Sequence, residues 1–283
     1  MKFLAPFLVS FFMKDYAKEA KQVRKDILKM VHKAQTSHIA SNFSAVDIAV
    51  VLYNNLKEGD QVFWSAGWKA ALIYRMLAKQ GKIPVEDLDK FPHAPYLALA
   101  ETSVNGVLVS GGSMSHGLPI AVGMALGKKK LGEKGTIYCI MSDGEMQEGT
   151  IWEAAQVAAH HELNNLVVLI DYNKWCAMGK TNEVCDLEPL ERRWAGFMWD
   201  VNRIDGHDYS KIQANLGAIK QLKRDNRGKV RPAVVICETI KGKGVSFFEN
   251  PPEHKDMGDT GHLYHYKYID EDIFKRAMAE LNA

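Results

Sequence analysis

Two oxygen-bearing side chains, Asp143 and Asn173, each follow an apolar run of the kind that forms a buried strand. Asp143 comes after residues 136–141, and Asn173 comes shortly after residues 166–170. Carboxylate and amide oxygens suit Mg²⁺ or Ca²⁺ and do not suit zinc or copper. Because Mg²⁺ seldom sits in an all-protein cage, phosphate oxygens and water would complete its coordination. The spacing therefore predicts a divalent cation that holds a diphosphate-bearing cofactor.

Gly144 and the segment after it fit this interpretation. A glycine lets the backbone approach a phosphate closely, and the start of a helix predicted for residues 150–161 offers a positive dipole end to an anion. An Asp-Gly pair is also a common turn, and Asp143 could simply cap the following helix. The second oxygen ligand, at the end of the neighbouring apolar run, favours the cation site.

The elements that must position these residues form a regular alternation of strands and helices. Such alternation predicts an α/β fold, in which a mostly parallel sheet carries helices on both faces. Polar loops that follow parallel strands gather at one edge of the sheet, so Asp143, Asn173, His207 and the loop of Lys241 should converge there. The predicted strands are residues 60–65, 136–141, 166–170, 199–204 and 233–238, and the predicted helices are 14–33, 45–56, 68–79, 118–130, 150–161, 189–195, 209–223 and 270–281.

Composition limits the classes of function. The chain has 283 residues, and its 36 basic and 34 acidic residues leave a formal net charge of +2, which argues against a nucleic-acid surface as its main property. Four widely spaced cysteines indicate free thiols in a reducing compartment, so we expect a cytoplasmic protein that does not cross a membrane. The apolar run after Lys2 contains Pro6 and lacks a cleavage site, and we interpret residues 1–16 as an arm that packs on this chain or a partner. Residues 17–283 then form one domain.

Several motifs together carry a resemblance to a known family. Ser142-Asp143-Gly144-Glu145-Met146-Gln147-Glu148-Gly149, followed by Trp152-Glu153-Ala154 and by Asn173, is similar to the thiamine diphosphate motif of transketolases. From about residue 17 to about residue 250, the chain resembles the N-terminal, thiamine diphosphate-binding half of a transketolase that is split over two genes. Further motifs in the family's order are Thr36-Ser37-His38, Gly112-Ser113 with His116-Gly117, Asp205-Gly206-His207-Asp208, and Thr239-Ile240-Lys241-Gly242-Lys243-Gly244.

The resemblance implies a role for each matching position. It implies that Asp143, Asn173 and the backbone carbonyl of Trp175 hold Mg²⁺, with Ca²⁺ as an alternative. Gly144 and Glu145 would then lie against the diphosphate of thiamine diphosphate, and the loop of Lys241 would help to bind this cofactor. The implied catalytic residues are His38 and His207, which face the thiazolium carbon and the substrate, and His116 near the aminopyrimidine; Glu148 is implied at a subunit contact.

The resemblance also implies a reaction and a partner. A transketolase passes a two-carbon ketol unit from a ketose to an aldose, and either sugar can be a phosphate ester. The glutamate that activates the cofactor's aminopyrimidine lies on the half of the enzyme that this chain lacks. We therefore expect an active heteromer with a C-terminal subunit that carries the pyrimidine-binding domain, in a heterotetramer of two copies of each chain.

Three departures fall on the substrate side. Trp68 in Ser65-Ala66-Gly67-Trp68 stands where the family has histidine, and an indole has one N–H donor and no acceptor nitrogen. In the long loop of residues 81–110, His93 is an uncertain substitute for the family's Gly-His-Pro. After Asn250, residues 251–268 replace the usual Trp-His-Gly, and either His254 or His262 could stand in. A specialised transketolase that acts on an unusual sugar is therefore an equal alternative.

Two other functions stay open at this point. The alpha subunit of a 2-oxoacid dehydrogenase is also split and also uses an Asp-Gly and Asn pattern, although residues 205–208 and 241–244 speak against it. A catalytically silent subunit that binds only cofactor or partner is the other, and Trp68 is the best argument for it. A plain nucleotide-binding domain is disfavoured, because no Gly-x-Gly-x-x-Gly follows an early predicted strand.

Overall fold

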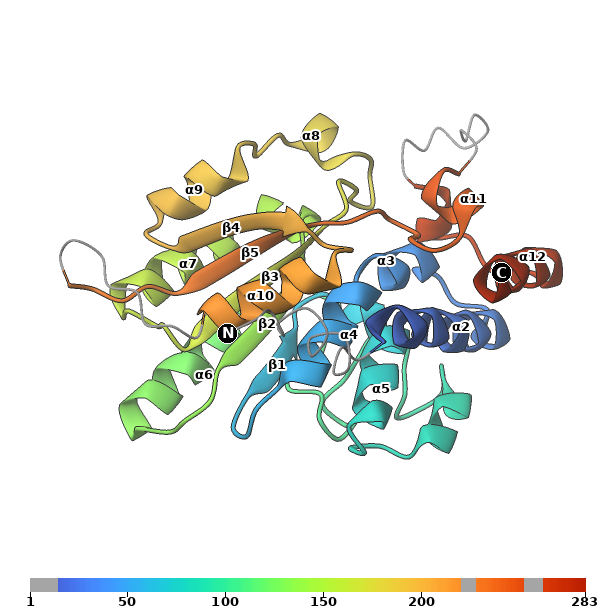
Figure 1. Cartoon of the computed structure of the whole chain (residues 1–283), viewed down its shortest axis with the longest axis horizontal. Helices are drawn as coiled ribbons and strands as arrows, with labels where there is room; N and C mark the ends of the chain where they lie inside the picture. Colours follow the sequence, from blue (N-terminus) through green and yellow to red (C-terminus); the bar gives the residue numbers. More distant parts are fainter. Residues whose placement is uncertain (1–14, 220–227, 252–261) are drawn as a thin grey trace, which may run out of the picture.

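A five-stranded parallel sheet organises the computed structural model, which describes residues 15–219, 228–251 and 262–283 (Figure 1). Every pair of neighbouring strands is parallel, which confirms the predicted α/β fold with a parallel sheet. The last strand inserts between the third and fourth, an order that a strand-by-strand reading of the sequence does not reveal. The order across the sheet is β1 (Gln61–Trp64), β2 (Ile137–Ser142), β3 (Leu166–Tyr172), β5 (Ala233–Glu238) and β4 (Asp200–Asp205).

Helices account for most of the remaining described chain. Two features were not predicted: a short helix begins at Ile39, where we expected a break, and further short helical turns interrupt the long loops. The predicted arm (residues 1–16) falls almost wholly outside the described residues. The helices are α2 (Tyr16–Ala34), α3 (Ile39–Ser44), α4 (Val46–Asn55), α5 (Ala70–Lys79), α6 (Gly117–Leu131), α7 (Gly149–His160), α8 (Thr181–Val184), α9 (Leu190–Gly196), α10 (Tyr209–Ile219), α11 (Ser246–Glu249) and α12 (Glu271–Asn282), with 3₁₀ turns η1 (Gly67–Lys69), η2 (Val85–Lys90), η3 (Gly144–Gln147) and η4 (Leu263–His265).

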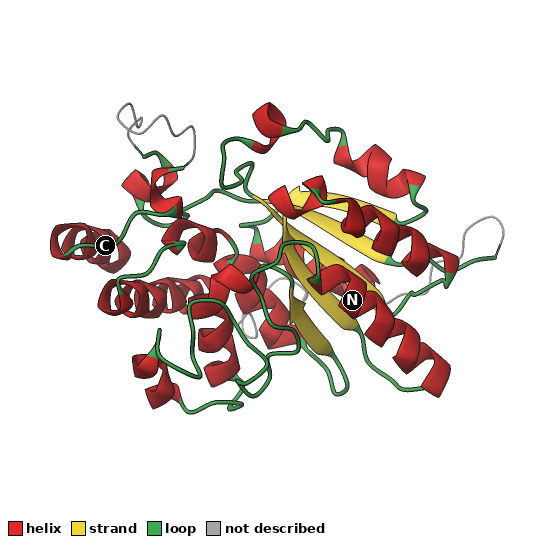
Figure 2. Cartoon of the chain, turned by 180° about the vertical axis from the view of Figure 1, so that it is seen from behind, coloured by secondary structure: helices red, strands yellow, loops and turns green. Residues whose placement is uncertain are grey.

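The two faces of the sheet bury two separate hydrophobic clusters. Successive strand residues point to opposite faces, so Val167 and Leu169 of β3 join one cluster while Val168 and Ile170 join the other. Helices α2, α4, α5, α10 and α12 supply the first cluster, and α6, α7 and α9 supply the second. Figures 1 and 2 show these two helical layers from opposite sides. Because strands β2, β3 and β5 are buried on both faces, their sequences read as continuous apolar runs.

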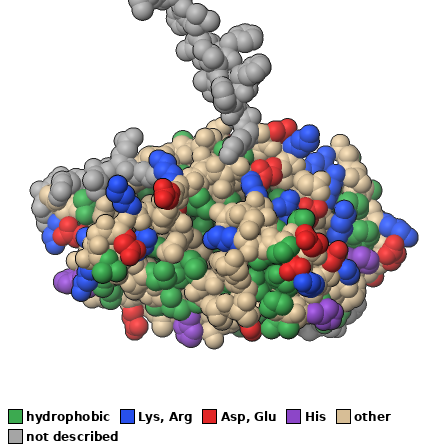
Figure 3. Space-filling view, turned by 90° about the horizontal axis from the view of Figure 1, so that it is seen from below, with side chains coloured by type: hydrophobic (Ala, Val, Ile, Leu, Met, Phe, Trp, Pro, Cys, Tyr) green, Lys and Arg blue, Asp and Glu red, His purple; other side chains and the backbone are tan. Residues whose placement is uncertain are grey.

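The outer surface carries both signs of charge. On the face seen in Figure 3, Lys and Arg side chains are interspersed with Asp and Glu and with hydrophobic side chains, so neither sign dominates that face. Among the described residues, no helix combines the length and the apolar character that crossing a bilayer requires.

Two glycines bring the loop after β1 against the loop before α6. A Cβ atom added to Gly67 would lie 2.2 Å from the Cα of Gly111, and one added to Gly111 would lie 2.3 Å from the Cα of Gly67. Ala100 bridges the two loops, because its N–H donates to the Gly67 carbonyl (3.0 Å) and its own carbonyl accepts from the Gly111 N–H (2.6 Å). This contact fixes the position of the next residue, Trp68.

We predict that Gly67→Ala destabilises the chain. The new methyl group would meet backbone atoms that cannot yield without moving a loop, and such overpacking costs about 1–3 kcal/mol. Gly217→Ala is the matched control, because Gly217 is an exposed residue of α10 whose added Cβ meets nothing within 4 Å. That variant should gain about 0.5–1 kcal/mol through helix propensity. Urea unfolding measures both changes, and equal stability of Gly67→Ala and wild type would contradict the prediction.

Candidate functional site

The predicted site residues gather at the carboxyl ends of the strands, where a cavity of about 290 Å³ opens. Four of them line it: His38 before α3, Gly144 after β2, and Asn173 and Trp175 after β3. Trp68 lines it as well. Residues separated by more than a hundred positions are therefore brought to one place, as expected for loops at the carboxyl edge of a parallel sheet.

Asp143 is a buried carboxylate that accepts no hydrogen bond from a charged side chain in the part of the chain that the structure describes. It is 1% exposed, and its two oxygens accept from the backbone N–H groups of Gly144 (2.9 Å) and Lys174 (2.6 Å). Burial, assisted by the nearby charge of Asp171, raises the pKa of Asp143 to about 7. A carboxylate in this environment attracts a cation strongly.

The side chain of Asn173 is held in one orientation. Its Nδ2 donates to Oδ2 of Asp171 (3.2 Å) and to Oγ of Ser44 (3.3 Å), while its Oδ1 accepts from the Trp175 N–H (3.1 Å). The amide oxygen therefore lies on the side away from Asp171, toward the loop that carries Trp175. This orientation presents an oxygen, and not an N–H group, for ligand binding.

Asn173 is hydrogen-bonded to a fully buried ion pair, Lys69–Asp171. Lys69 and Asp171 both have side chains that are 0% exposed, and Nζ of Lys69 donates to Oδ2 of Asp171 at 2.7 Å. The hydroxyls of Ser44 (2.6 Å) and Thr239 (2.5 Å) donate to the same carboxylate. Burial acts to raise the pKa of Asp171, but Lys69 and the two hydroxyls hold it below its usual value. This pair was not predicted from the sequence, because neither Lys69 nor Asp171 belongs to the predicted set of metal ligands.

The residues present fit a divalent cation with a diphosphate. Asp143 offers a buried carboxylate without a cationic hydrogen-bond partner, and Asn173 offers an oriented amide oxygen, which is the donor set that Mg²⁺ takes. A Cβ on Gly144 would approach the Cβ of Cys176 to 3.0 Å. A glycine at this position therefore leaves the backbone uncovered, which suits the close approach of a phosphate. Among the described residues, no three His, Cys, Asp or Glu side chains are grouped to hold a metal.

His38 reaches the cavity from a strained backbone position. Its φ of 71° lies in the left-handed region, which a residue with a side chain seldom adopts. Its N–H donates to the carbonyl of His265 (2.7 Å), and its Nδ1 lies 2.6 Å from Oγ of Ser37. Burial, with Lys241 and Lys69 nearby, lowers the pKa of His38 to about 4, so its ring is neutral at physiological pH.

A second histidine of the cavity, His265, was missed by the sequence analysis. Its ring lies 4.7 Å from that of His38, and its Nδ1 lies 2.9 Å from Nζ of Lys241. Burial lowers the pKa of Lys241 to about 7, while burial and Lys241 lower the pKa of His265 to about 2. Of the histidines after Asn250, only His254 and His262 were predicted to replace the family's histidine. Only its packing against His38 singles out His265.

His262, one of the two histidines considered in advance, is not among the residues that line the cavity. His262 is buried with its ring centroid 5.3 Å from that of Trp175, and neither of its ring nitrogens has a hydrogen-bond partner among the described residues. His254 lies outside the described residues. His93 is exposed on the loop after η2 and does not line the cavity.

His207 uses both ring nitrogens in contacts outside the cavity lining. Its Nδ1 lies 2.6 Å from Oδ2 of Asp47, and its Nε2 accepts from the Ile240 N–H at 2.9 Å. Asp47 is itself buried and paired with Arg24 at 2.8 Å, and Tyr209 donates to it at 3.0 Å. His207 thus anchors the loop after β4 to the helical layer, and its catalytic role stays a prediction.

Glu145 and His116 also lie outside the cavity lining. Glu145 is fully buried, and its carboxylate accepts from Oγ of Ser65 (2.6 Å), the N–H of Ser115 (3.1 Å) and the N–H of Ser142 (2.8 Å). Three loops are joined by this one side chain, whose pKa is raised by burial. His116 is exposed at the start of α6. Contact of either residue with a cofactor, and of exposed Glu148 with another subunit, stays a prediction.

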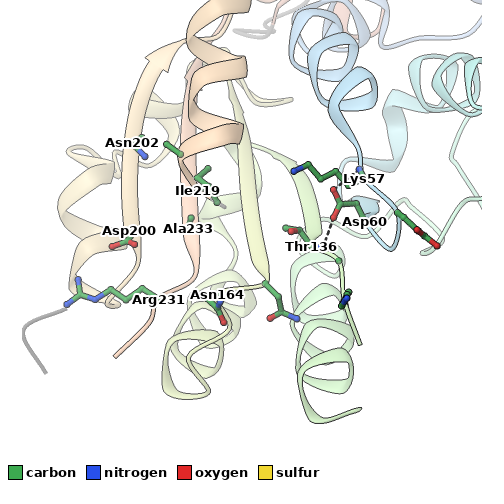
Figure 4. Close-up of a pocket in the computed structure, with 14 residues that line it drawn as sticks. Lys57, Asp60, Thr136, Asn164, Asp200, Asn202, Ile219, Arg231 and Ala233 are labelled. Carbon is green, nitrogen blue, oxygen red and sulfur yellow. Dashed lines mark hydrogen bonds between the residues drawn. The ribbon is translucent and has the colours of Figure 1, made fainter. Parts of the chain in front are cut away.

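A second cavity, of about 590 Å³, lies at the opposite end of the sheet (Figure 4). Lys57, Asp60, Thr136, Asp200 and Arg231 are among the residues that line it, and none of the predicted site residues does. It is the larger cavity, but ligands in parallel α/β sheets bind beyond the carboxyl ends of the strands. The smaller cavity is therefore the candidate site.

Most of the chain is similar to known proteins. Residues 16–256 match the family described as "Transketolase, thiamine diphosphate binding domain". A 6-deoxy-6-sulfo-D-fructose transketolase subunit from Clostridium sp. (strain MSTE9) is 33% identical over 94% of this chain and 96% of that protein, and an apulose-4-phosphate transketolase subunit from Actinobacillus succinogenes is 33% identical over 93% and 95%. The crystal structure of transketolase from Campylobacter jejuni superposes with a TM-score of 0.82 at 26% identity, over 94% of this chain but only 42% of that one.

We predict that Lys69→Met destabilises the fold by about 3–5 kcal/mol, because it leaves Asp171 buried without its countercharge. Lys275→Met is the matched control, since Lys275 pairs with Glu271 on the surface, where both side chains are mostly exposed. Such surface pairs contribute well under about 1 kcal/mol. Urea unfolding at pH 7 compares the two, and a loss in Lys69→Met no larger than that in the control would refute the assignment.

The Asp47 network predicts a stability that depends on pH. Burial acts to raise the pKa of Asp47, but Arg24 and His207 bring it from 3.8 down to about 2. A depressed folded-state pKa contributes stability that is complete above about pH 4 and is lost as the pH falls toward 2. Asp47→Asn should therefore unfold more easily than wild type at pH 7, by about 2 kcal/mol, and the difference should shrink between pH 4 and pH 2. A difference independent of pH, in urea unfolding across this range, would speak against the network.

Proposed function

This chain belongs to the transketolase family as an N-terminal, thiamine diphosphate-binding subunit, and we propose that it transfers a two-carbon ketol unit from a ketose to an aldose together with a separate C-terminal subunit. The observation that carries this proposal is the convergence of His38, Gly144, Asn173 and Trp175 on one cavity, in a chain whose relatives are named transketolase subunits. The donor and acceptor are sugars or sugar phosphates.

In this proposal the cofactor is held from its diphosphate end. Asp143, the amide oxygen of Asn173 and the carbonyl of Trp175 hold Mg²⁺, for which Ca²⁺ can substitute, and the backbone at Gly144 contacts the diphosphate. Bound thiamine diphosphate supplies the carbanion chemistry that breaks and forms the carbon–carbon bond. The protein contributes binding, orientation and proton transfer.

The cavity histidines are suited to holding protons at defined atoms. When Lys241 is protonated, it donates to Nδ1 of His265, and a neutral His265 then carries its own proton on Nε2. His38 lies beside it and is neutral at physiological pH, so it can accept a proton. We retain His116 and His207 as proposed catalytic residues and Glu145 and Lys241 as proposed cofactor-binding residues, because their motif positions match the family.

A partner subunit follows from the same comparisons. The two relatives matched over nearly their whole length are named as subunits, and this chain spans 42% of the Campylobacter enzyme. We propose that the partner supplies the pyrimidine-binding domain, that two copies of each chain associate, and that the assembly works in the cytoplasm.

The purified pair tests the proposed activity directly. Ketol transfer to an aldose with added thiamine diphosphate and Mg²⁺ is the expected result, and loss of transfer when this chain is omitted is the control. Oxidative decarboxylation of a 2-oxo acid without ketol transfer would assign the pair to the dehydrogenase class instead. Cofactor binding without any turnover would assign this chain as a silent subunit.

We predict that Asp143→Asn lowers the affinity of the assembled pair for thiamine diphosphate with Mg²⁺ by about 100-fold or more. Even the partners of metal ligands typically contribute 10–100-fold to metal affinity, and a direct ligand contributes no less. Isothermal titration calorimetry measures the affinity, with Asp89→Asn, a change at an exposed position of η2, as the matched control. Unchanged affinity in Asp143→Asn would remove this residue from the site.

A further inference from the structure

The backbone of His38 is held on both sides by hydrogen bonds. Its N–H donates to the carbonyl of His265 (2.7 Å), and its carbonyl accepts from the backbone N–H (3.0 Å) and from Nδ2 (2.8 Å) of Asn42. Asn42 is 1% exposed, and its side-chain oxygen accepts from the N–H of Leu72 in α5. Because its N–H and its carbonyl both have partners, His38 keeps its left-handed φ of 71°, with its ring in the cavity lining.

The ring of His38 is confined as well. The ring of His265 lies edge-on to it with 4.7 Å between centroids, and the ring of Tyr266 lies edge-on at 5.7 Å. Edge-on contacts between rings are favourable, so they resist rotation of the imidazole. His38 precedes α3, whereas its two neighbours belong to the segment at η4, so tertiary packing sets the orientation of the ring.

Ser37 binds one of the two ring nitrogens. Its Oγ lies 2.6 Å from Nδ1 of His38. Side chains of consecutive residues point to opposite faces of a strand and do not face each other on a helix, so this contact is unusual and accompanies the left-handed backbone. With Nδ1 bonded to Ser37, Nε2 is the nitrogen left for a ligand of the cavity, whether that ligand is cofactor or substrate.

The neutral ring of His38 carries its one proton either on Nδ1 or on Nε2. In the first arrangement Nδ1–H donates to Oγ of Ser37, which is half-buried and can pass its own hydroxyl proton to water. In the second, Ser37 donates to Nδ1 and the proton lies on Nε2. Lys69 lines the cavity, Lys241 bonds to His265, and both charges act on His38. Nearby cations favour the first arrangement, because an unprotonated nitrogen is attracted to them and an N–H group is repelled.

We propose that Ser37 is a positioning residue that holds His38 with its proton on Nδ1 and so presents Nε2 to the cavity as a proton acceptor. This role rests on the proposed function, in which His38 accepts a proton. Ser37 is not among the residues that line the cavity, and it acts through the orientation and tautomer of His38. Without the hydroxyl, the ring would return to the tautomer that free histidine prefers in water, which is protonated on Nε2 and cannot accept a proton there.

Nitrogen NMR tests the tautomer independently of activity. The full-length chain, labelled with ¹⁵N-histidine and assembled with its partner but without cofactor, is measured by magic-angle-spinning NMR at pH 7, and His38→Gln identifies the His38 signals by their loss. Wild type should show a protonated Nδ1 and an unprotonated Nε2. Ser37→Ala should exchange the two, and Ser37→Thr should keep the wild-type pattern because it keeps the hydroxyl. Ser103→Ala, at an exposed position, is the matched control.

Ketol transfer by the assembled pair measures the catalytic consequence. With thiamine diphosphate, Mg²⁺ and hydroxypyruvate as donor, Ser37→Ala should lower kcat by about tenfold or more, because a positioned general base contributes about 10²–10⁴-fold. Ser37→Thr should restore kcat. The affinity for thiamine diphosphate, measured by calorimetry, should not change in either variant.

Each other outcome decides against a specific statement. A proton on Nε2 in wild type, or an unchanged His38 signal in Ser37→Ala, would overturn the positioning role, while ketol transfer by the same pair would leave the proposed function standing. An exchanged tautomer with an unchanged kcat would also overturn the role, because the reaction would not use Nε2 as a base. Absence of transfer by the wild-type pair would overturn the proposed function and the positioning role with it. The wild-type spectrum needs no variant, so it decides the tautomer even if Ser37→Ala does not fold.

Discussion

The geometry of the site depends on the buried ion pair between Lys69 and Asp171. A buried pair is tolerated only when its remaining hydrogen-bonding capacity is satisfied, and here Ser44, Thr239 and Asn173 complete the carboxylate. Lys69 lies in the turn after β1, and Ser44 is the last residue of α3. Asn173 follows β3, and Thr239 follows β5. The hydrogen bonds to the Asp171 carboxylate therefore fix the relative positions of these four segments. They also orient the amide of Asn173. In this region the same network of hydrogen bonds stabilises the fold and sets the geometry of the site.

Two further buried carboxylates, Glu145 and Asp47, join separate segments in the same way. Glu145 joins the loops that follow β1 and β2 to the start of α6, and Asp47 joins α2 and α4 to the loop after β4. Each is buried and each uses its oxygens on protein donors. Asp143 differs, because only backbone N–H groups meet its oxygens and its pKa is raised to about 7. A carboxylate without a charged hydrogen-bond partner among the described residues suits the metal-binding role proposed for Asp143.

Much of the fold and part of the site could be predicted from the sequence, for separate physical reasons. Strands buried on both faces leave uninterrupted apolar runs. The rule that loops converge at the carboxyl edge grouped Asn173 with Asp143, His207 and Lys241, and of these four only Asn173 is among the residues that line the cavity. His38 and Trp175, which also line it, were expected from the family resemblance alone. The helix at Ile39 was not predictable, because six residues are too few for periodicity and its stability comes from tertiary burial. The Lys69 pair and His265 were missed because their partners are distant in sequence: spacing counts positions along the chain, whereas an ion pair or a ring contact depends on packing. His207 was found by its motif, but its ring contacts Asp47 and Ile240 and does not line the cavity. A sequence motif does not determine the direction in which a side chain points.

The uncompensated carboxylate of Asp143 has a consequence for the life of the protein. Burial of this charge weakens the empty chain at neutral pH, and a bound cation with its cofactor would remove that penalty. Folding and cofactor binding are then coupled. As the cofactor becomes available, the fraction of unfolded chain falls, and with it the fraction that proteases can cleave. At the proposed site, binding of the cofactor would therefore also protect the fold.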